Sequence, residues 1–220
     1  MFTGKIRIAL MSLLTLAALG TAVLATSGAA GTATHSHKKL GAQKLAFHDA
    51  MRTLWEDHIT WTRMFIVEFA ADSPATDATA ERLLQNQVDI GDAIKPFYGD
   101  EAGDQLTALL EDHIQTAADI LVAAKAGDQA AVDEASERWY VNADDIAAFL
   151  SSANPDHWPL GEMQAMMRDH LDLTLAEAVA RLQGDFDADI VAYDEIHGQI
   201  LEMADMLSAG IVAQFPKAFK

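Results

Sequence analysis

Apolar residues recur with helical spacing along most of the chain after residue 43. From Leu106 to Leu121, apolar residues and one histidine occupy the i, i+3, i+4 and i+7 positions that share one face of a helix. No segment shows the sustained alternation of apolar and polar residues that a half-buried strand requires. Breaks in the pattern, most of them at glycine or proline, predict helices at about 43–71, 76–94, 101–126, 129–152, 160–182 and 186–214.

The breaks between these helices are short, which favours antiparallel neighbours. We therefore expect an all-α fold, a six-helix bundle built from three consecutive helical hairpins, over residues 43–220. Each hairpin has to bury its apolar face against the others, so the three are expected to form one domain. Residues 34–42 are expected to be a flexible tether between this domain and the segment before it.

Residues 1–33 have the features of an export leader. Lys5 and Arg7 precede a long apolar stretch that ends in small residues. The segment predicts a signal peptide or, because the apolar run is long enough to cross a bilayer, an N-terminal membrane anchor attached through residues 5–30. Either alternative places the helical domain outside the cytoplasm: in the periplasm, secreted, or anchored to the outer face of the cytoplasmic membrane.

One polar pattern occurs three times along the chain. Each copy places a histidine on the apolar face of the first helix of a hairpin, and an amide and a carboxylate, three residues apart, on the second helix. Histidine and carboxylate are separated by 31, 32 and 32 residues, and successive histidines by 55 and 57. A period of this size indicates a repeated supersecondary unit. The three copies are His58, Asn86 and Asp89; His113, Asn142 and Asp145; and His170, Gln199 and Glu202.

The repeated set has two interpretations. An unpaired buried polar group costs about 1–3 kcal/mol, so each histidine is expected to bond an amide or carboxylate of its own hairpin, and the set then only fixes helix packing. Alternatively, the three copies converge on one site that binds a transition-metal ion such as Zn, Cu, Fe, Mn or Ni. The amides would then orient the imidazoles. The predicted metal ligands are His58, His113, His170, Asp89, Asp145 and Glu202, with Asn86, Asn142 and Gln199 beside them.

The third copy departs from the other two. Glu177 lies seven residues after His170, at a position where the first two copies have apolar residues. Asp194 and His197 form a further i,i+3 pair on the last predicted helix. If the bundle has an open functional end, we expect it at this hairpin, with Glu177, Asp194 and His197 as auxiliary ligand-binding residues.

Methionine and tether histidines supply weaker signals. Thioether and imidazole groups together favour copper, although methionine is also a common filler of apolar cores. The histidines of the tether, His35 and His37, form a further candidate chelator of copper or nickel. The methionines near the third histidine or on its partner helix are Met163, Met166, Met167, Met203 and Met206.

Composition narrows the function further. The formal net charge is −18, and loss of a leader that carries two basic and no acidic residues brings it to −20. A field of this sign attracts cations and repels phosphate backbones, which disfavours nucleic-acid binding. The absence of cysteine excludes disulfides, thiolate metal ligands and thiol catalysis. The chain also lacks the common zinc-protease, serine-hydrolase, phosphate-loop and di-iron motifs, which favours a non-catalytic role.

Five short stretches spread over residues 50–216 carry a family resemblance. They are Leu54–Arg63, Lys95–Gly99, Arg138–Asp144, Met203–Met206 and Gln214–Pro216. Together they resemble a family of small, uncharacterised, all-helical bacterial proteins that are exported or displayed at the surface. Members carry glycosyltransferase or acetylglutamate kinase labels, but a short helical chain without a nucleotide-binding motif agrees with neither activity. The resemblance therefore implies the fold, and marks Arg63, His58 and Asn142 as positions of interest without a role.

These observations together predict an extracytoplasmic helical domain that binds a transition-metal ion or a small cationic ligand through the repeated polar set. The alternative is a non-catalytic structural or protein-interaction module whose polar core only fixes helix packing. Replacement of His113 by leucine separates the two, because it removes ligand binding in the first case and changes only stability in the second.

Overall fold

The computed structural model describes residues 41–219 of the chain. Within this range the protein forms six α-helices and no strand, as the apolar spacing predicts. The helices are α1 (Ala42–Ala70), α2 (Thr76–Tyr98), α3 (Asp100–Ala126), α4 (Gln129–Ala153), α5 (Leu160–Gln183) and α6 (Phe186–Gln214). The predicted leader and all but the end of the tether lie outside the described residues. None of these six helices is both long and apolar enough to cross a membrane.

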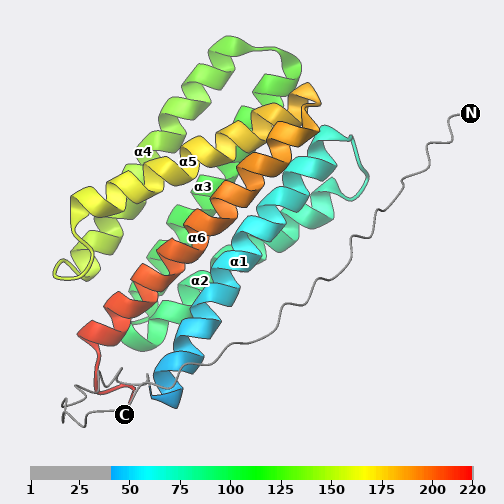
Figure 1. The fold of residues 1–220 in the computed structure, drawn as a ribbon. Coiled ribbons are helices and arrows are strands. Elements are labelled where there is room, and N and C mark those ends of the chain that lie inside the picture. The colour runs from blue at the N-terminus through cyan, green and yellow to red at the C-terminus, as the bar shows by residue number, and fades with distance from the viewer. Residues whose placement is uncertain (1–40, 220) are drawn as a thin grey trace, which may run out of the picture. The chain divides into compact units, whose positions relative to one another are not determined.

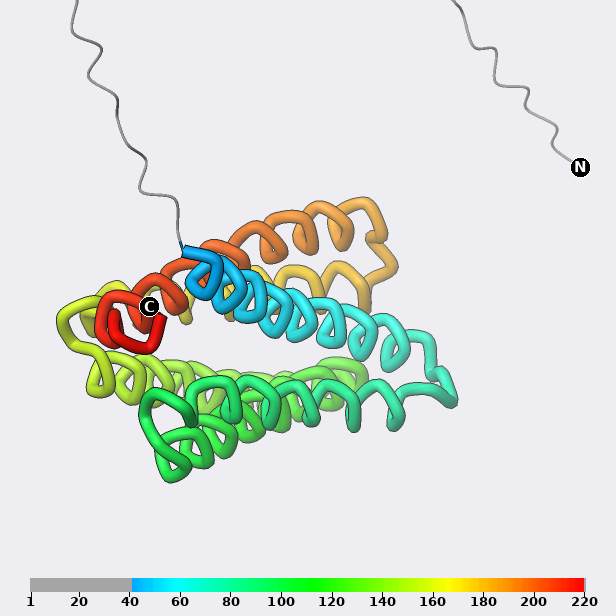
Figure 2. The backbone as a smooth tube through the Cα atoms, turned by 90° about the horizontal axis from the view of Figure 1, so that it is seen from below, coloured from blue at the N-terminus to red at the C-terminus, as the bar shows by residue number. Residues whose placement is uncertain are grey.

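The six helices form a closed ring around a common axis (Figures 1 and 2). Each helix packs against the next one in the chain, and α6 closes the ring by packing against α1. The hairpins α1–α2, α3–α4 and α5–α6 therefore follow one another around the axis. The buried apolar residues of all six helices fill the inside of the ring. This arrangement allows α1, α3 and α5, which carry the three predicted histidines, to meet at the centre.

The second and third hairpins turn through the same Gly-Asp sequence. Gly127 ends α3 with φ 72° and Gly184 ends α5 with φ 74°, a backbone region that favours glycine. Asp128 and Asp185 then begin the next helix, and each side chain accepts a hydrogen bond from the backbone N–H three residues later, at 3.1 and 3.2 Å. The recurrence of these turns agrees with the repeat in the sequence.

Five helix ends differ from the expected ones by one residue, and one differs by four. α1 already includes Ala42, which was expected in the tether. α2 continues through Pro96 to Tyr98, four residues further than predicted. Proline lies here in the last helical turn, where its missing N–H removes only one hydrogen bond. Phe97 packs against Phe47 and Phe219 with ring centroids 5.2 and 5.5 Å apart, and this aromatic contact stabilises the extra turn.

At two places a glycine allows neighbouring parts of the ring to pack unusually closely. Gly91 of α2 faces Gly103 of α3 so closely that a Cβ on Gly91 would lie 2.6 Å from the Gly103 carbonyl oxygen. The loop between α4 and α5 inserts Trp158, whose indole Nε1 would lie 2.1 Å from a Cβ on Gly210 of α6. Trp158 is buried and contributes to the wall of a central cavity. The absence of a side chain at Gly91 lets α3 come close to α2, and its absence at Gly210 lets the loop that carries Trp158 come close to α6.

Candidate functional site

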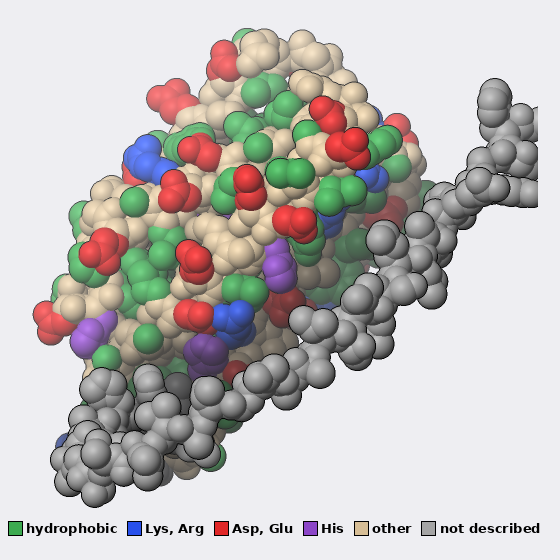
Figure 3. All heavy atoms as spheres, viewed as in Figure 1, with side chains coloured by type: hydrophobic (Ala, Val, Ile, Leu, Met, Phe, Trp, Pro, Cys, Tyr) green, Lys and Arg blue, Asp and Glu red, His purple; other side chains and the backbone are tan. Residues whose placement is uncertain are grey.

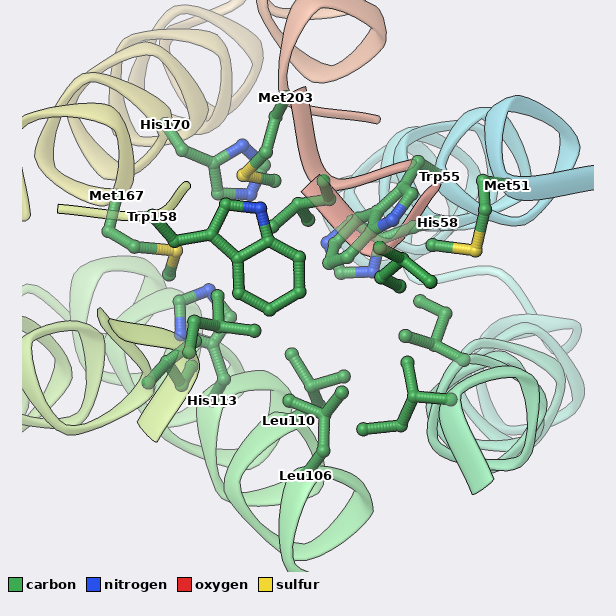
Figure 4. Close-up of a pocket in the computed structure, with 16 residues that line it drawn as sticks. Met51, Trp55, His58, Leu106, Leu110, His113, Trp158, Met167, His170 and Met203 are labelled. Carbon is green, nitrogen blue, oxygen red and sulfur yellow. The ribbon is translucent and has the colours of Figure 1, made fainter. Parts of the chain in front are cut away.

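His58 on α1, His113 on α3 and His170 on α5 meet at the axis of the ring. Their side chains are buried, with exposed fractions of 2%, 3% and 4%. The ring centroids of His58 and His170 lie 5.7 Å apart, and those of His113 and His170 lie 6.1 Å apart. All three rings line one internal cavity, as Figure 4 shows. We call these three residues the imidazole cluster; the inward orientation that the apolar spacing predicts for them is confirmed.

The amides of the second and third copies hold their histidines in the same way. Asn142 donates from Nδ2 to the Leu109 carbonyl oxygen at 3.0 Å, so its Oδ1 faces His113 Nδ1 at 2.9 Å. Gln199 donates from Nε2 to the Met166 carbonyl oxygen at 3.1 Å, and its Oε1 faces the Nδ1 of its own histidine at 3.2 Å. An amide oxygen only accepts, so each Nδ1 carries the proton and each Nε2 keeps its lone pair.

The first copy keeps only half of this arrangement. Asn86 donates from Nδ2 to the Leu54 carbonyl oxygen at 3.0 Å, the same backbone contact as in the other copies. Its Oδ1, however, accepts from Gln87 Nε2 at 3.3 Å. Among the described residues, His58 Nδ1 has no hydrogen-bond partner, and neither has Gln87 Oε1. Unlike His113 and His170, His58 therefore has no amide oxygen in hydrogen-bond geometry with its Nδ1.

Burial keeps the imidazole cluster neutral. It lowers the pKa of His113 to about 3, with a smaller effect from the neighbouring His170. It likewise lowers the pKa of His170 to about 4. The pKa of His58 also falls well below its ordinary value, because of burial and then because of the other two histidines. At neutral pH all three rings are uncharged, which is the form in which imidazole binds metal ions.

The cavity bounded by the imidazole cluster is small and otherwise apolar. Its volume is about 30 Å³, which accommodates roughly two water molecules or one ion. An organic ligand does not fit this space. Aliphatic and indole side chains form most of the wall, and the sulfur-containing residues Met51, Met167 and Met203 complete it.

The predicted carboxylates do not reach the imidazole cluster. Asp89 lies at the surface with its side chain 39% exposed and accepts a hydrogen bond from Gln85. Asp145 and Glu202 are exposed as well. Among residues 41–219, no group of three or more His, Asp or Glu side chains has its ligand atoms placed to hold a metal ion as the structure stands. The structure thus brings together the histidines and amides of the predicted set without its acidic members.

Glu177 belongs to a second buried group of polar side chains, which is separate from the imidazole cluster. Its Oε1 accepts from Arg63 Nη1 at 2.7 Å, and Arg63 also donates to Asp189, with Nη2 to Oδ2 at 2.9 Å. Arg181 donates to the same Asp189 oxygen at 3.2 Å. Both carboxylate side chains are fully buried. We call Arg63, Arg181, Glu177 and Asp189 the arginine cluster; it ties α1 to α5 and α6.

The other two auxiliary residues lie at the surface. Asp194 is exposed on α6. His197 contacts Glu56 of α1, with Nε2 and Oε1 3.2 Å apart, and both side chains are partly exposed. The structure therefore does not bring Asp194 or His197 to the central cavity, and the only auxiliary residue that it buries is Glu177.

Two features escaped the sequence reasoning. The partners of Arg63 were unforeseen, although Asp189 stands on the same apolar stripe as Ala192 and Ile196, a spacing that places a carboxylate inside. An aspartate also precedes each cluster histidine, at positions 57, 112 and 169. In the second copy Asp112 accepts from Asn142 at 3.0 Å. This aspartate was a further signal of the repeat.

On the face of the bundle seen in Figure 3, acidic side chains outnumber basic ones. Figure 3 shows Asp and Glu side chains spread over the face formed by α1, α5 and α6, with few Lys and Arg side chains between them. Several acidic groups are paired with a neighbouring base, as Asp205 is with Arg52. The surface therefore favours the approach of cations over that of anions.

Comparisons with protein-family models, with curated proteins and with solved structures give no match. Any function must therefore be argued from the imidazole cluster and its surroundings.

Proposed function

We propose that this protein is a non-catalytic, extracytoplasmic domain that binds one transition-metal ion in its central cavity through His58, His113 and His170. One observation carries the proposal: three imidazoles from three different helices line one cavity, and amides hold two of them with Nε2 unprotonated. An unprotonated imidazole nitrogen is the commonest nitrogen ligand of protein-bound metals.

The ring spacing supports the proposal. Imidazoles that bind one metal ion through Nε2 at about 2.0–2.1 Å have ring centroids roughly 5–6 Å apart. The separation of His58 and His170, 5.7 Å, lies within this range, and that of His113 and His170, 6.1 Å, lies just above it. The rings must rotate inward to complete the site, because among residues 41–219 no three His, Asp or Glu side chains are placed to hold an ion as the structure stands.

The remaining predicted residues have other roles in this proposal. Asn142 and Gln199 orient imidazoles and do not touch the ion, in the manner of outer partners of metal-bound histidine. Asp89, Asp145 and Glu202 contribute only to the negative field around the bundle. Export, with or without membrane attachment through residues 5–30, is proposed from the sequence of the leader alone.

A structural role is the second candidate, and one observation favours it. In every copy the amide also donates to a backbone carbonyl four residues before the histidine, so it fixes one helix of the hairpin against the other. A polar core of this kind sets helix register without any ligand. The two candidates differ in the role of the unprotonated Nε2 atoms. In the first they bind the metal ion, and in the second they bind nothing.

Elemental mass spectrometry of the full-length protein separates the two candidates. The chain is produced without a histidine tag, with His35 and His37 replaced by alanine, in medium supplemented with Zn, Cu, Ni, Mn and Fe. We expect about one equivalent of metal, its loss in His170→Leu, and its retention in the surface control His197→Gln. Circular dichroism establishes that both variants fold. A metal-free protein, or a folded His170→Leu variant that keeps its metal, contradicts the proposal.

A further inference from the structure

The wall of the central cavity carries no charged group. It consists of the three neutral imidazoles together with aliphatic, indole and thioether side chains. Asp89 is 39% exposed, Asp145 and Glu202 lie at the surface, and the buried Glu177 does not line the cavity and bonds Arg63 through Oε1. A divalent ion in this space would have no carboxylate among the lining residues to offset its charge. Because the solvation penalty rises with the square of the charge, a monovalent ion is disfavoured far less.

Soft ligands line the same space as the imidazoles. Met167 lies one helical turn before His170 on α5, and Met203 lies on the adjacent α6. Figure 4 shows both thioethers on the cavity wall together with the three rings. Thioether sulfur binds hard cations such as magnesium and calcium poorly and selects cuprous copper among the biological metals.

The size of the cavity points to an ion with few ligands. About 30 Å³ leaves room for a bare ion and not for one that retains a shell of several waters. Ions that require octahedral oxygen coordination are therefore excluded on size as well as on ligand type. An ion bound by two to four nitrogen and sulfur atoms fits.

From these three observations we infer that the ion is monovalent copper, Cu(I), bound by two to four of the five nitrogen and sulfur atoms that the imidazole cluster, Met167 and Met203 offer, with at least one thioether among them. The inference rests on the proposed metal-binding function and goes further in naming the ion and the thioethers. It requires no change of oxidation state within the protein, since copper enters and leaves as Cu(I).

The test is a competition titration with a colourimetric Cu(I) chelator, carried out without oxygen and with ascorbate present. The protein is the full chain with His35 and His37 replaced by alanine. Its Met167→Leu/Met203→Leu double variant removes both sulfur atoms at nearly constant volume, so folding is retained. Met163→Leu is the matched control, because Met163 is equally buried on α5 but does not line the cavity. A parallel titration uses Zn(II) and a zinc chelator.

We expect one Cu(I) per chain, at least about tenfold weaker binding in the double variant, and unchanged binding in Met163→Leu. Zn(II) should bind much more weakly than Cu(I). Equal Cu(I) affinity in the double variant and the parent, or stronger binding of Zn(II), overturns the copper inference and leaves the metal-binding proposal standing. Failure of the parent chain to bind either ion overturns the copper inference, and together with a metal-free result in the elemental analysis it overturns both.

Discussion

The imidazole cluster and the arginine cluster are both buried, yet they satisfy their polar atoms in opposite ways. In the arginine cluster two guanidinium groups face two carboxylates, so the charges balance within the cluster and nearly every strong contact is internal. The imidazole cluster is neutral, and its amide bonds occupy only Nδ1. The first cluster compensates its own charges, although Glu177 Oε2 has no hydrogen-bond partner among the described residues. The second keeps unprotonated nitrogens beside a cavity. A ligand is therefore expected at the imidazoles, and a structural role at the arginines.

The largest expected effect concerns acid. The unfolded chain protonates its histidines near pH 6.5, whereas the folded pKa values of His113 and His170 are about 3 and about 4. Their stabilising contribution is therefore complete above pH 6.5 and is lost as the pH falls toward 4 and below. By pH 5 the metal-free protein should lose on the order of 2 kcal/mol for each of His113 and His170.

Urea unfolding at pH 7.5 and pH 5 measures this loss. His113→Leu should reduce the dependence on pH, and His197→Gln, at the surface, should leave it as in the parent chain. A parent chain that is equally stable at both pH values would mean that the imidazoles are accessible to protons in the folded state, contrary to their burial.

The arginine cluster should give the largest effect of a single substitution. Asp189→Ala leaves Arg63 and Arg181 without their shared partner inside the bundle. Removal of one member of a buried ion pair destabilises by about 3–5 kcal/mol, which chemical denaturation measures directly. The matched control is Asp194→Ala on the exposed face of the same helix. Similar losses in both variants would show that the buried contacts of Asp189 contribute little. The metal content of Asp189→Ala should not change, because the arginine cluster holds no ligand.

Replacement of Asn142 is expected to lower both the stability of the fold and the affinity for metal. It contacts His113, the Leu109 carbonyl oxygen and Asp112, all within 3.0 Å. Asn142→Ala should destabilise by about 1–3 kcal/mol through the unpaired groups that it leaves. It should also weaken metal binding by about 10–100-fold, because His113 loses its orientation. Val141→Ala, at an exposed neighbour, is the control. Loss of stability without loss of metal affinity would favour the purely structural role of the amides.

The smallest effects are expected at the predicted carboxylates. Replacement of Asp89, Asp145 and Glu202 by the corresponding amides should change the free energy of unfolding by less than about 0.5 kcal/mol each. The metal stoichiometry should remain that of the parent chain. If the triple variant folds but fails to bind metal, the carboxylates reach the site in solution. The claim that they are surface residues without a part in binding is then wrong.

The sequence predicts the helices and the inward histidines because both depend on the period of the helix. His113, for instance, lies on the same stripe as Leu106, Leu110 and Ile114, and all four are buried. The expected end of α2 was too early, because the pattern contains no information about the aromatic contacts of Phe97 with Phe47 on the neighbouring α1 and with Phe219.

For the predicted carboxylates, helical periodicity alone does not determine whether the side chain points into the bundle or toward solvent. A residue three positions along a helix is rotated by about 60° from the first, so an acid next to an inward amide stands at the edge of the buried face. Asn86 is buried and Asp89 is 39% exposed, since a charged group at this edge stays in water. The spacing that groups amide and acid therefore leaves the direction of the acid open. Asp189, in contrast, can be buried because Arg63 and Arg181 compensate its charge.

The most direct test of the central claim is a crystal structure of the protein after incubation with Cu(I), with diffraction data collected on both sides of the copper absorption edge. The account predicts one anomalous peak on the axis of the ring, within bonding distance of imidazole nitrogens of His58, His113 and His170. An empty cavity in such a crystal, or a peak only at surface side chains such as His48 and Asp205, would contradict it.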